Sequence, residues 1–251
     1  MLPNFLIIGA ARAGTTTIYN HLRDHPDVYL PAQKRPEPHF FLKQSEYARG
    51  ITYYEQRFFS ASRNERAVGE ASTSYVFGER VPGRIRQALP DVRLICVLRN
   101  PVERAFSGYW HTVKNGLETL SFEEAVAQET ARKVELAGTA MGEVAPFAYV
   151  ERGLYHQQLS RWFAEFPRSR MKIVIFDDFV DDPNKGLREI AAFIGVDPDN
   201  LPERPVEMEN KSVPELAQML PETRERLIDA FRPDLVNLGR MLERDFSAWL
   251  R

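Results

Sequence analysis

The sequence predicts an α/β protein, with an open, parallel, P-loop-like sheet flanked by helices on both faces. Two observations lead to this fold class. Short apolar segments alternate along the chain with amphipathic helical segments, a pattern typical of βαβ units. In addition, the first apolar segment leads through a glycine-bounded loop into a helix, as in phosphate-binding βα units.

The strand and helix candidates follow one another in order. Apolar stretches are expected to form strands at residues 4–9, 28–30, 67–72, 93–98 and 172–177. The intervening and following helical segments are residues 15–24, 80–89, 101–115, 153–166 and 183–194. Within these segments the apolar residues recur at helical spacing, which predicts that one helix face lies against the sheet.

Local signals set several helix boundaries. Ser121 and Glu124 form a capping box, which predicts a helix ending near Leu136. Pro183 and Gly195 bracket another helix, with proline at its start and glycine just past its end.

The remaining segments carry weaker signals. Residues 137–150 mix glycine, alanine and proline without a period, so we expect a connector or a substrate-facing loop. Residues 214–251 are expected to form two short helices ending near Trp249. Because no linker composition interrupts the chain, residues 1–251 are expected to form a single domain.

The loop at residues 9–14, here called the anion loop, has the properties of a phosphate site. Gly9 and Gly14 let the backbone turn and approach an oxyanion closely. The following helix start offers backbone N–H groups and a dipole that favours negative charge. Arg12 adds a cation, and hydroxyl donors follow at Thr15, Thr16 and Thr17.

The anion loop differs from a Walker A loop at a decisive position. The glycine spacing fits, but Thr15 stands where the Walker lysine would follow Gly14, and the cation has moved to Arg12. A nucleoside triphosphatase also needs an acid at the end of a later strand to hold Mg²⁺. Here the strand at 93–98 is followed by Arg99, which suits an anion held directly by protein, with no bridging metal.

A second anion-binding segment follows Arg99. Pro101 is well placed to start a helix, and Ser107 lies two turns into that helix. In open α/β sheets, ligands bind outside the carboxyl ends of the strands. Two strand ends with anion-binding groups predict a ligand with two separated anionic parts.

These segments resemble a known family, the sulfotransferases that use 3′-phosphoadenosine 5′-phosphosulfate (PAPS). Residues 9–17 resemble the family's 5′-phosphosulfate loop, and residues 99–109 resemble its 3′-phosphate motif. The segment Glu37 to Phe41 resembles the Glu-Pro-His-Phe-Phe block of the heparan-type branch. Further matching blocks lie at residues 153–163, 175–179, 210–212 and 242–249, so the resemblance covers nearly the whole chain.

The resemblance implies the sulfotransferase fold and the transfer of a sulfuryl group from PAPS to an acceptor hydroxyl, giving adenosine 3′,5′-bisphosphate. It implies that Glu37 is the base, with His39 as the runner-up, and that Arg12 stabilises the developing charge. Glu70 is a third candidate base. The implied donor-binding residues are Ala11, Arg12, Ala13, Gly14, Thr15, Thr16, Thr17, Arg99, Ser107, Tyr155 and Lys211, with no metal.

The chain departs from the family pattern at two positions. The family's loop carries lysine where this chain has Arg12, which keeps the charge but forks onto two oxygens. The family block Glu-Lys-[Ser/Thr]-Pro-x-Tyr appears at residues 70–75 as Glu-Ala-Ser-Thr-Ser-Tyr, so its lysine is replaced by Ala71. Lys34 and Arg35 are candidates to replace that lysine.

Composition limits the partners and the compartment. The formal charge is −2, so there is no global field for nucleic acid or an anionic membrane. The single cysteine, Cys96, lies in an apolar run, is expected to fill the core and permits no internal disulfide. The N-terminus has no charged, cleavable leader, and no apolar stretch reaches the ~20 residues of a membrane span. A soluble, cytoplasmic enzyme is therefore expected.

Two other function classes stay open from the sequence. One is a P-loop nucleotide kinase or NTPase, which the missing Walker lysine and strand-end acid disfavour. The other is a non-catalytic nucleotide-binding module, against which Glu37 and His39 argue. The expected acceptor is a hydroxyl-bearing glycan, lipid or small metabolite, and the sequence does not choose among them.

Overall fold

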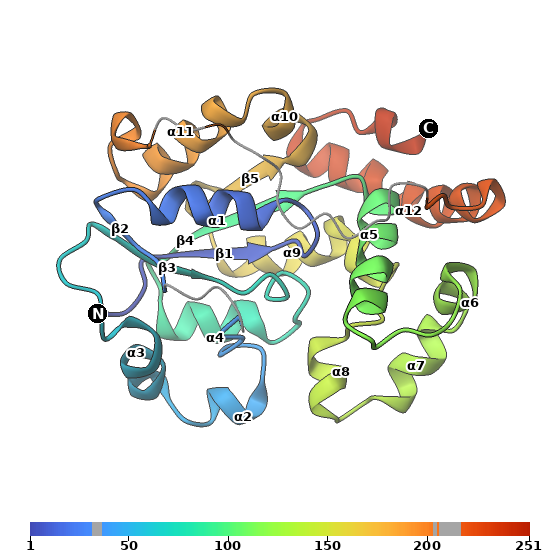
Figure 1. Ribbon diagram of the computed structural model, residues 1–251, viewed down its shortest axis with the longest axis horizontal. Coiled ribbons are helices and arrows are strands. Elements are labelled where there is room, and N and C mark those ends of the chain that lie inside the picture. The colour runs from blue at the N-terminus through green and yellow to red at the C-terminus, as the bar shows by residue number, and fades with distance from the viewer. Residues whose placement is uncertain (32–36, 203–204, 206–216) are drawn as a thin grey trace. The chain divides into compact units, whose positions relative to one another are not determined.

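The protein forms two compact units, each described by itself. The computed structural model describes residues 1–31, 37–202, 205 and 217–251 (Figure 1). The sheet unit comprises Met1–Leu98 and Arg161–Glu209, and the helical unit comprises Arg99–Ser160 and Asn210–Arg251. That residues 1–251 form a single domain stays a prediction.

The sheet unit is built on five parallel strands in the order β2-β3-β1-β4-β5. Every residue of β1 and β3 is buried, which explains why these strands read as apolar runs without alternation. The bounds are β1 (Phe5–Gly9), β2 (Val28–Tyr29), β3 (Ala67–Ala71), β4 (Arg93–Leu98) and β5 (Met171–Ile175).

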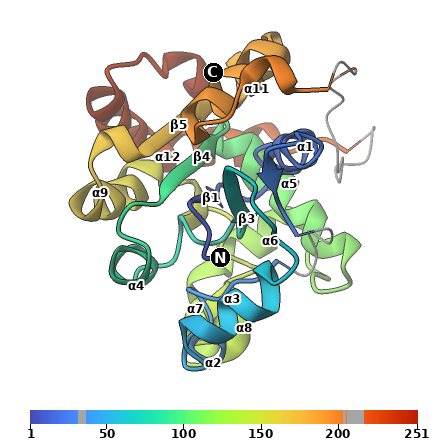
Figure 2. The same cartoon turned by 90° about the vertical axis from the view of Figure 1, so that its left-hand side faces the viewer.

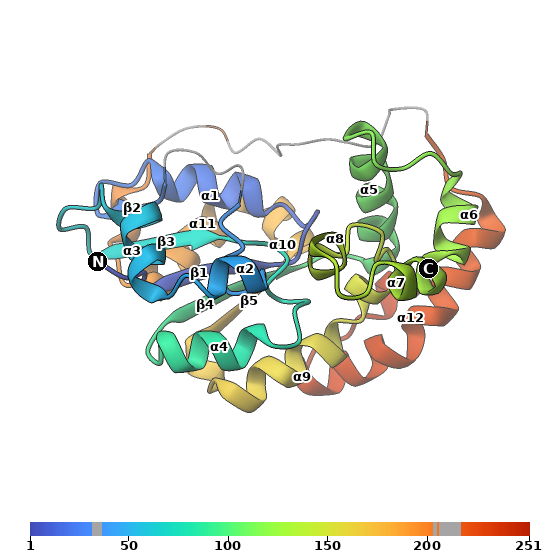
Figure 3. The same cartoon turned by 90° about the horizontal axis from the view of Figure 1, so that it is seen from below.

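Helices cover both faces of this sheet, as Figures 1 and 2 show. On one face lie α1 (Thr15–Arg23) and α11 (Pro183–Ile194), which pack against each other. On the other face lies α4 (Val81–Ala88), and Figure 3 shows the sheet between α1 and α4. The predicted open parallel sheet with helices on both faces is therefore confirmed.

The ends of α11 follow the predicted signals. The Asp182 side chain accepts a hydrogen bond from Lys185 N, and Pro183 occupies the first turn. Gly195 ends the helix at φ 89°, a left-handed conformation that glycine adopts readily.

Three helices of the sheet unit were not predicted. These are α2 (Gln44–Tyr47), α3 (Ile51–Phe59) and α10 (Phe176–Asp181). The expected strand at 172–177 is wrong in its last residues, because β5 ends at Ile175 and α10 begins at Phe176. Helices α2 and α3 are short, and an aromatic cluster holds them in place. In this cluster the Tyr54 ring stacks on Phe40 at 4.5 Å between centroids and meets Phe41 and Phe59 edge-on.

The helical unit centres on α5 (Pro101–Lys114). The Asn100 side chain caps its first turn by accepting a hydrogen bond from Val102 N at 3.0 Å, and Pro101 follows the cap. Helix α12 (Pro221–Leu242) packs on α5, and its Arg224 forms an ion pair with Glu103 of α5 at 2.7 Å. The other helices are α6 (Phe122–Ala127), α7 (Glu129–Glu135), α8 (Ala140–Val144) and the start of α9 (Tyr155–Glu165).

The expectation for the C-terminal tail is wrong. The tail holds one long helix, α12, followed by a 3-10 turn at Ser247–Leu250, and not two short helices. The helix continues through Pro233 because buried residues on either side of it, including Phe231 and Leu235, hold it in place.

The capping box at Ser121 is confirmed, but the helix that it opens ends at Ala127, so the expected end near Leu136 is wrong. Gln128 separates α6 from α7. Residues 137–150 include α8, so they are not one continuous loop. In the part of the chain that the structure describes, no helix combines the length and apolarity needed to cross a bilayer.

Candidate active site

The anion loop joins β1 to α1 at the carboxyl edge of the sheet. Because β1 lies between β3 and β4, this is where the order of the strands reverses, the usual ligand position in such sheets. Gly9 has φ +152°, and a Cβ there would lie 2.5 Å from Val76 Cγ1 and 2.9 Å from the Thr73 carbonyl oxygen. The loop backbone therefore packs directly on the segment that follows β3.

The loop ends in a helix start suited to an anion. Arg12 and Gly14 adopt left-handed conformations, with φ 71° and 83°. The N-cap residue of α1 is Gly14, which has no side chain to cap the helix, and the first turn holds no acidic residue. Thr15 and Thr17 are buried, and Thr16 is partly exposed. Backbone N–H groups, hydroxyls and a guanidinium are the donor set of a phosphate site.

Glu37 is held in a defined orientation beside this loop. Thr73 N donates to Glu37 Oε2 at 2.8 Å, and Thr73 Oγ1 donates to Oε1 and Oε2 at 3.0 and 3.1 Å. His39 Nε2 lies 2.8 Å from the same Oε2. The side chains of Glu37 and His39 are 15% and 14% exposed, so each keeps a small accessible surface.

His39 is fixed through its backbone as well. It adopts φ 49°, and its N–H donates to Ser72 Oγ at 2.9 Å. Ser72 N in turn donates to Ile7 O, and Val76 N donates to Ile8 O. The segment after β3 is thereby hydrogen-bonded both to the end of β1 and to the predicted pair of Glu37 and His39.

Glu70 lies at the end of β3 behind this pair and is only 1% exposed. Its Oε1 accepts a hydrogen bond from Tyr54 OH at 3.1 Å, while Oε2 accepts none of ordinary geometry. Burial raises the pKa of Glu70 to about 8, against the opposing effect of the Ser72 and Tyr75 hydroxyls, and the Glu37 carboxylate adds to the rise. Glu70 is thus largely protonated at neutral pH.

The second predicted anion-binding segment lies in the helical unit. Arg99 directly follows the last residue of β4, and Ser107 lies on α5 with 3% exposure. The hydroxyl of Tyr155 donates to the Arg99 carbonyl oxygen at 2.9 Å. The Tyr155 ring is buried and packs on Trp249, so this tyrosine holds the backbone at the start of the motif.

Comparison with known proteins identifies the family. A profile of the sulfotransferase domain matches residues 2–218. The chain belongs to the sulfotransferase family. A sulfotransferase from Alicyclobacillus acidocaldarius has 36% sequence identity and a TM-score of 0.83, and each chain is covered completely. The predicted family and fold are therefore confirmed.

Two mammalian relatives match a part of their length. Heparan sulfate glucosamine 3-O-sulfotransferase 3B1 of Mus musculus is 31% identical over 78% of this chain and 46% of its own length. The human bifunctional heparan sulfate N-deacetylase/N-sulfotransferase 3 is 29% identical over 78% of this chain and 23% of its own length. The chain thus spans about half of the first protein and about a quarter of the second.

Several residues of this sulfotransferase were missed by the sequence reasoning. Thr73 gave one usable signal: it follows a parallel strand, and such strands end at the same edge as the anion loop. Arg104 on α5 gave no usable signal in the sequence. The structure buries it to 2% exposure, and a charged residue is not expected in such a place. Its guanidinium donates to the Tyr149 carbonyl oxygen, and burial lowers the pKa of Arg104.

Three residues named from the sequence, Lys34, Arg35 and Lys211, lie outside the described residues. Ala71, which replaces the family lysine, is buried at the end of β3. The two alanines of the anion loop differ in exposure, since Ala13 is buried and Ala11 is partly exposed.

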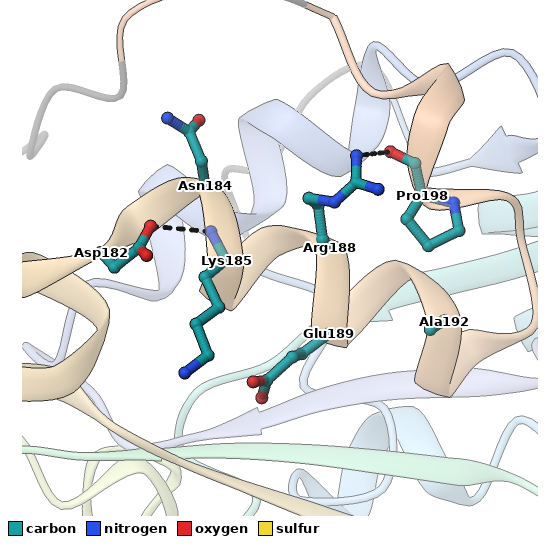
Figure 4. Close-up of a pocket in the computed structure, with 7 residues that line it drawn as sticks. All are labelled: Asp182, Asn184, Lys185, Arg188, Glu189, Ala192 and Pro198. Carbon is teal, nitrogen blue, oxygen red and sulfur yellow. Dashed lines mark hydrogen bonds between the residues drawn. The ribbon is translucent and has the colours of Figure 1, made fainter.

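A surface hollow of the sheet unit, shown in Figure 4, contains none of the predicted site residues. Its lining residues carry charges of both signs, and two of them form ion pairs. Arg188 pairs with Asp199 at 2.5 Å, and Glu189 pairs with Lys172 at 2.7 Å. The lining residues are Asp182, Asn184, Lys185, Arg188, Glu189, Ala192 and Pro198.

Proposed function

We propose that this protein is an enzyme that transfers a sulfuryl group from PAPS to an acceptor hydroxyl and releases adenosine 3′,5′-bisphosphate. One observation carries the proposal. Thr73 touches both halves of the chemistry, since its carbonyl oxygen packs on Gly9 of the anion loop and its N–H and hydroxyl hold Glu37. A carboxylate is thereby kept next to the loop that suits the donor's phosphosulfate.

The residues present fit the donor. The start of α1 at Gly14, the crowded Gly9 and the cation of Arg12 are suited to the 5′-phosphosulfate. We assign this part of the donor to residues 11–17. We assign the 3′-phosphate to Arg99 and Ser107, with Tyr155 supporting the Arg99 backbone, and Lys211 stays a predicted further contact.

The donor supplies the sulfuryl group, and the chain's residues manage the proton and the charge. Glu37 accepts the proton of the acceptor hydroxyl while that oxygen forms its bond to sulfur. As the bond from sulfur to the phosphate oxygen breaks, the electron pair stays on that oxygen. Arg12 and the N–H groups of the loop stabilise the resulting charge. The proposal assigns this role to protein groups and not to a metal.

The surroundings support Glu37 over the other two candidate bases. Glu70 is 1% exposed, so its carboxyl group does not reach an acceptor. His39 Nε2 lies 2.8 Å from Glu37 Oε2, where a ring N–H donates to the carboxylate and orients it. We therefore propose that His39 orients Glu37 and contacts the acceptor.

Replacing Glu37 by glutamine tests the proposal. Glu37→Gln keeps the shape of the side chain but removes the base, so the rate of sulfate transfer is expected to fall by about 10²–10⁴-fold. Binding of adenosine 3′,5′-bisphosphate, measured by calorimetry, is expected to stay within about threefold. The control is Glu79→Gln, the same change at an exposed glutamate of the sheet unit. Retained turnover in Glu37→Gln would remove Glu37 as the base.

The acceptor belongs to the same proposal. The names of the two mammalian relatives specify transfer to oxygen in one and to nitrogen in the other. We propose an oxygen acceptor, such as a carbohydrate hydroxyl, because an oriented carboxylate suits a hydroxyl that must lose its proton. A panel of sugars, lipids, amines and small alcohols with isotope-labelled PAPS, read by mass spectrometry, identifies it. Magnesium-dependent ATP hydrolysis without sulfate transfer would favour the NTPase alternative.

A cytoplasmic location also stays a proposal. The single cysteine, Cys96, is fully buried in β4, and burial raises the pKa of its thiol. The fold therefore uses cysteine as an apolar core residue, as proteins of reducing compartments do.

A further inference from the structure

Thr73 donates several hydrogen bonds to the Glu37 carboxylate, and the proposed reaction assigns Thr73 no role. Its N–H and its hydroxyl together give three of the hydrogen bonds that reach the two carboxylate oxygens. The residue is 7% exposed, so water competes little for these bonds. Its neighbour Ser72 holds the backbone of His39 in the same segment.

We propose that Thr73 is a positioning residue for sulfuryl transfer, which keeps the Glu37 carboxylate both oriented and ionised. The inference rests on the proposed function, because it concerns the base of that reaction. Two donors from one residue restrict the rotation of a carboxylate more than one donor does, and hydrogen bonds to a carboxylate favour its charged form.

The sequence of this segment supports a role specific to this chain. In the family pattern quoted above, proline stands where this chain has Thr73, and proline has no N–H to donate. The same block has lost its lysine at Ala71. Thr73 therefore supplies two donors to Glu37 in the block where the pattern's cation is missing.

Among the described residues, His39 and Glu70 are titratable groups that face the Glu37 carboxylate and shape its response to pH. His39 Nε2 lies 2.8 Å from Glu37 Oε2, on the segment that carries Glu37, and a hydrogen bond donated from this nitrogen stabilises the carboxylate. Glu70 lies at the end of β3, and its ionisation opposes that of Glu37. The Thr73 donors act in the same direction as His39. Removing the Thr73 hydroxyl therefore makes Glu37 harder to ionise.

The test compares Thr73→Val, which keeps size and N–H but removes the hydroxyl, with Thr73→Ser, which keeps the hydroxyl. In Thr73→Val we expect kcat/KM to fall about tenfold and the acid limb of its pH profile to move up by about half a pH unit or more. Thr73→Ser is expected to stay within about threefold of the wild type on the original profile. Thr223→Val, at a buried threonine of α12 that is 5% exposed, controls for the substitution itself.

A second readout does not need turnover. The ¹³C signal of the Glu37 carboxyl group, assigned by its loss in Glu37→Gln, is titrated without donor in the wild type and in Thr73→Val. A higher titration midpoint in Thr73→Val supports the inference. An unmoved midpoint and acid limb in a folded Thr73→Val variant overturn it. If the wild type sulfates no acceptor, the proposed function fails, while this titration still decides the effect of Thr73 on Glu37.

Discussion

Glu70, a buried carboxyl group that meets no cation among the described residues, is the least expected residue of this site. Glu70 is enclosed by the hydroxyls of Tyr54, Tyr75 and Ser72, and its Oε2 lacks an ordinary hydrogen bond. Such a site favours the protonated acid. A neutral Glu70 places no second negative charge beside Glu37. The ionised Glu37 carboxylate is therefore not opposed by a like charge from Glu70.

This arrangement makes stability depend on pH. The folded protein keeps a proton on Glu70 up to about pH 8, whereas the unfolded chain releases it near its ordinary pKa of 4.5. Between these values the unfolded state binds fewer protons, so stability falls as the pH rises. Glu70→Gln cannot ionise and is expected to escape that fall, a difference on the order of a few kcal/mol.

Urea unfolding of the wild type and Glu70→Gln at about pH 5 and pH 9 measures the difference. The variant should gain relative stability at the higher pH, while Glu79→Gln should follow the wild type at both. A constant difference between Glu70→Gln and wild type at the two pH values would contradict a buried, protonated Glu70.

At the residue scale, sequence reasoning worked where a residue belongs to a recognisable pattern. It named Glu37 and His39, which the structure brings together. It gave no role to Thr73 or Arg104, because their contacts join residues 36 and 45 positions apart in the chain. Only folding brings such partners together, and spacing along the sequence does not reveal them.

Among the elements, the anion loop has a tight steric requirement at Gly9. A side chain at Gly9 would overlap Val76 and the Thr73 carbonyl, and its φ of +152° is unfavourable for other residues. Gly9→Ala is therefore expected to destabilise the fold by about 2–4 kcal/mol and to weaken donor binding, because the loop must move away from the segment that holds Glu37.

Gly50→Ala is the matched control for this element. Gly50 also has a positive φ, +83°, but a Cβ there would meet nothing within 4 Å. Its substitution carries only the cost of a backbone conformation, φ 83° and ψ 163°, that is essentially restricted to glycine, about 1–3 kcal/mol, and should leave binding unchanged. Thermal unfolding and calorimetry of both variants separate the two effects. Equal losses of stability and unchanged binding in Gly9→Ala would contradict the close packing of the loop.

Element boundaries were predictable where a local signal decides them. The capping box at Ser121 gave the start of α6 correctly but not its end, and the proline and glycine around α11 gave both ends of that helix. The prediction of two short helices in the tail was wrong: α12 continues through Pro233, because tertiary burial of α12 outweighs the local preference of proline to end a helix. Helices α2 and α3 depend on an aromatic cluster that includes Phe40 and Tyr75, residues outside both helices.

For the whole molecule, donor binding should appear as added stability. A ligand that binds only the folded state at 100 times its Kd adds about 2.7 kcal/mol, which raises the Tm of a chain of this size by roughly 5–10 °C. We expect this shift with adenosine 3′,5′-bisphosphate. Arg99→Ala should remove most of it, because the 3′-phosphate loses its charge-assisted partner.

Adenosine 5′-phosphosulfate, which lacks the 3′-phosphate, provides the matched ligand. Its Tm shift, measured by differential scanning fluorimetry, should be nearly the same in Arg99→Ala and wild type. Arg226→Ala, at an exposed arginine of α12, should respond to both ligands as the wild type does. An equal loss of both shifts in Arg99→Ala would contradict the assignment of Arg99 to the 3′-phosphate.

At this scale, the sequence was sufficient for the fold class and the family. Alternating apolar and amphipathic segments predicted the parallel sheet, and matching blocks from residue 5 to residue 249 predicted the sulfotransferase family. The acceptor could not be predicted in the same way. Its recognition depends on the shape made by irregular segments, which carry no periodic pattern.

The position of β5 has a consequence for the growing chain. It pairs with β4 from Leu94↔Met171 to Leu98↔Ile175, yet residues 99–160 of the helical unit separate the two strands in sequence. During translation at roughly 5–20 residues per second, β5 is synthesised several seconds after β4. Throughout that interval an apolar strand edge is open to wrong partners. The nascent chain is therefore most prone to misassembly after β4 has emerged from the ribosome and before β5 has.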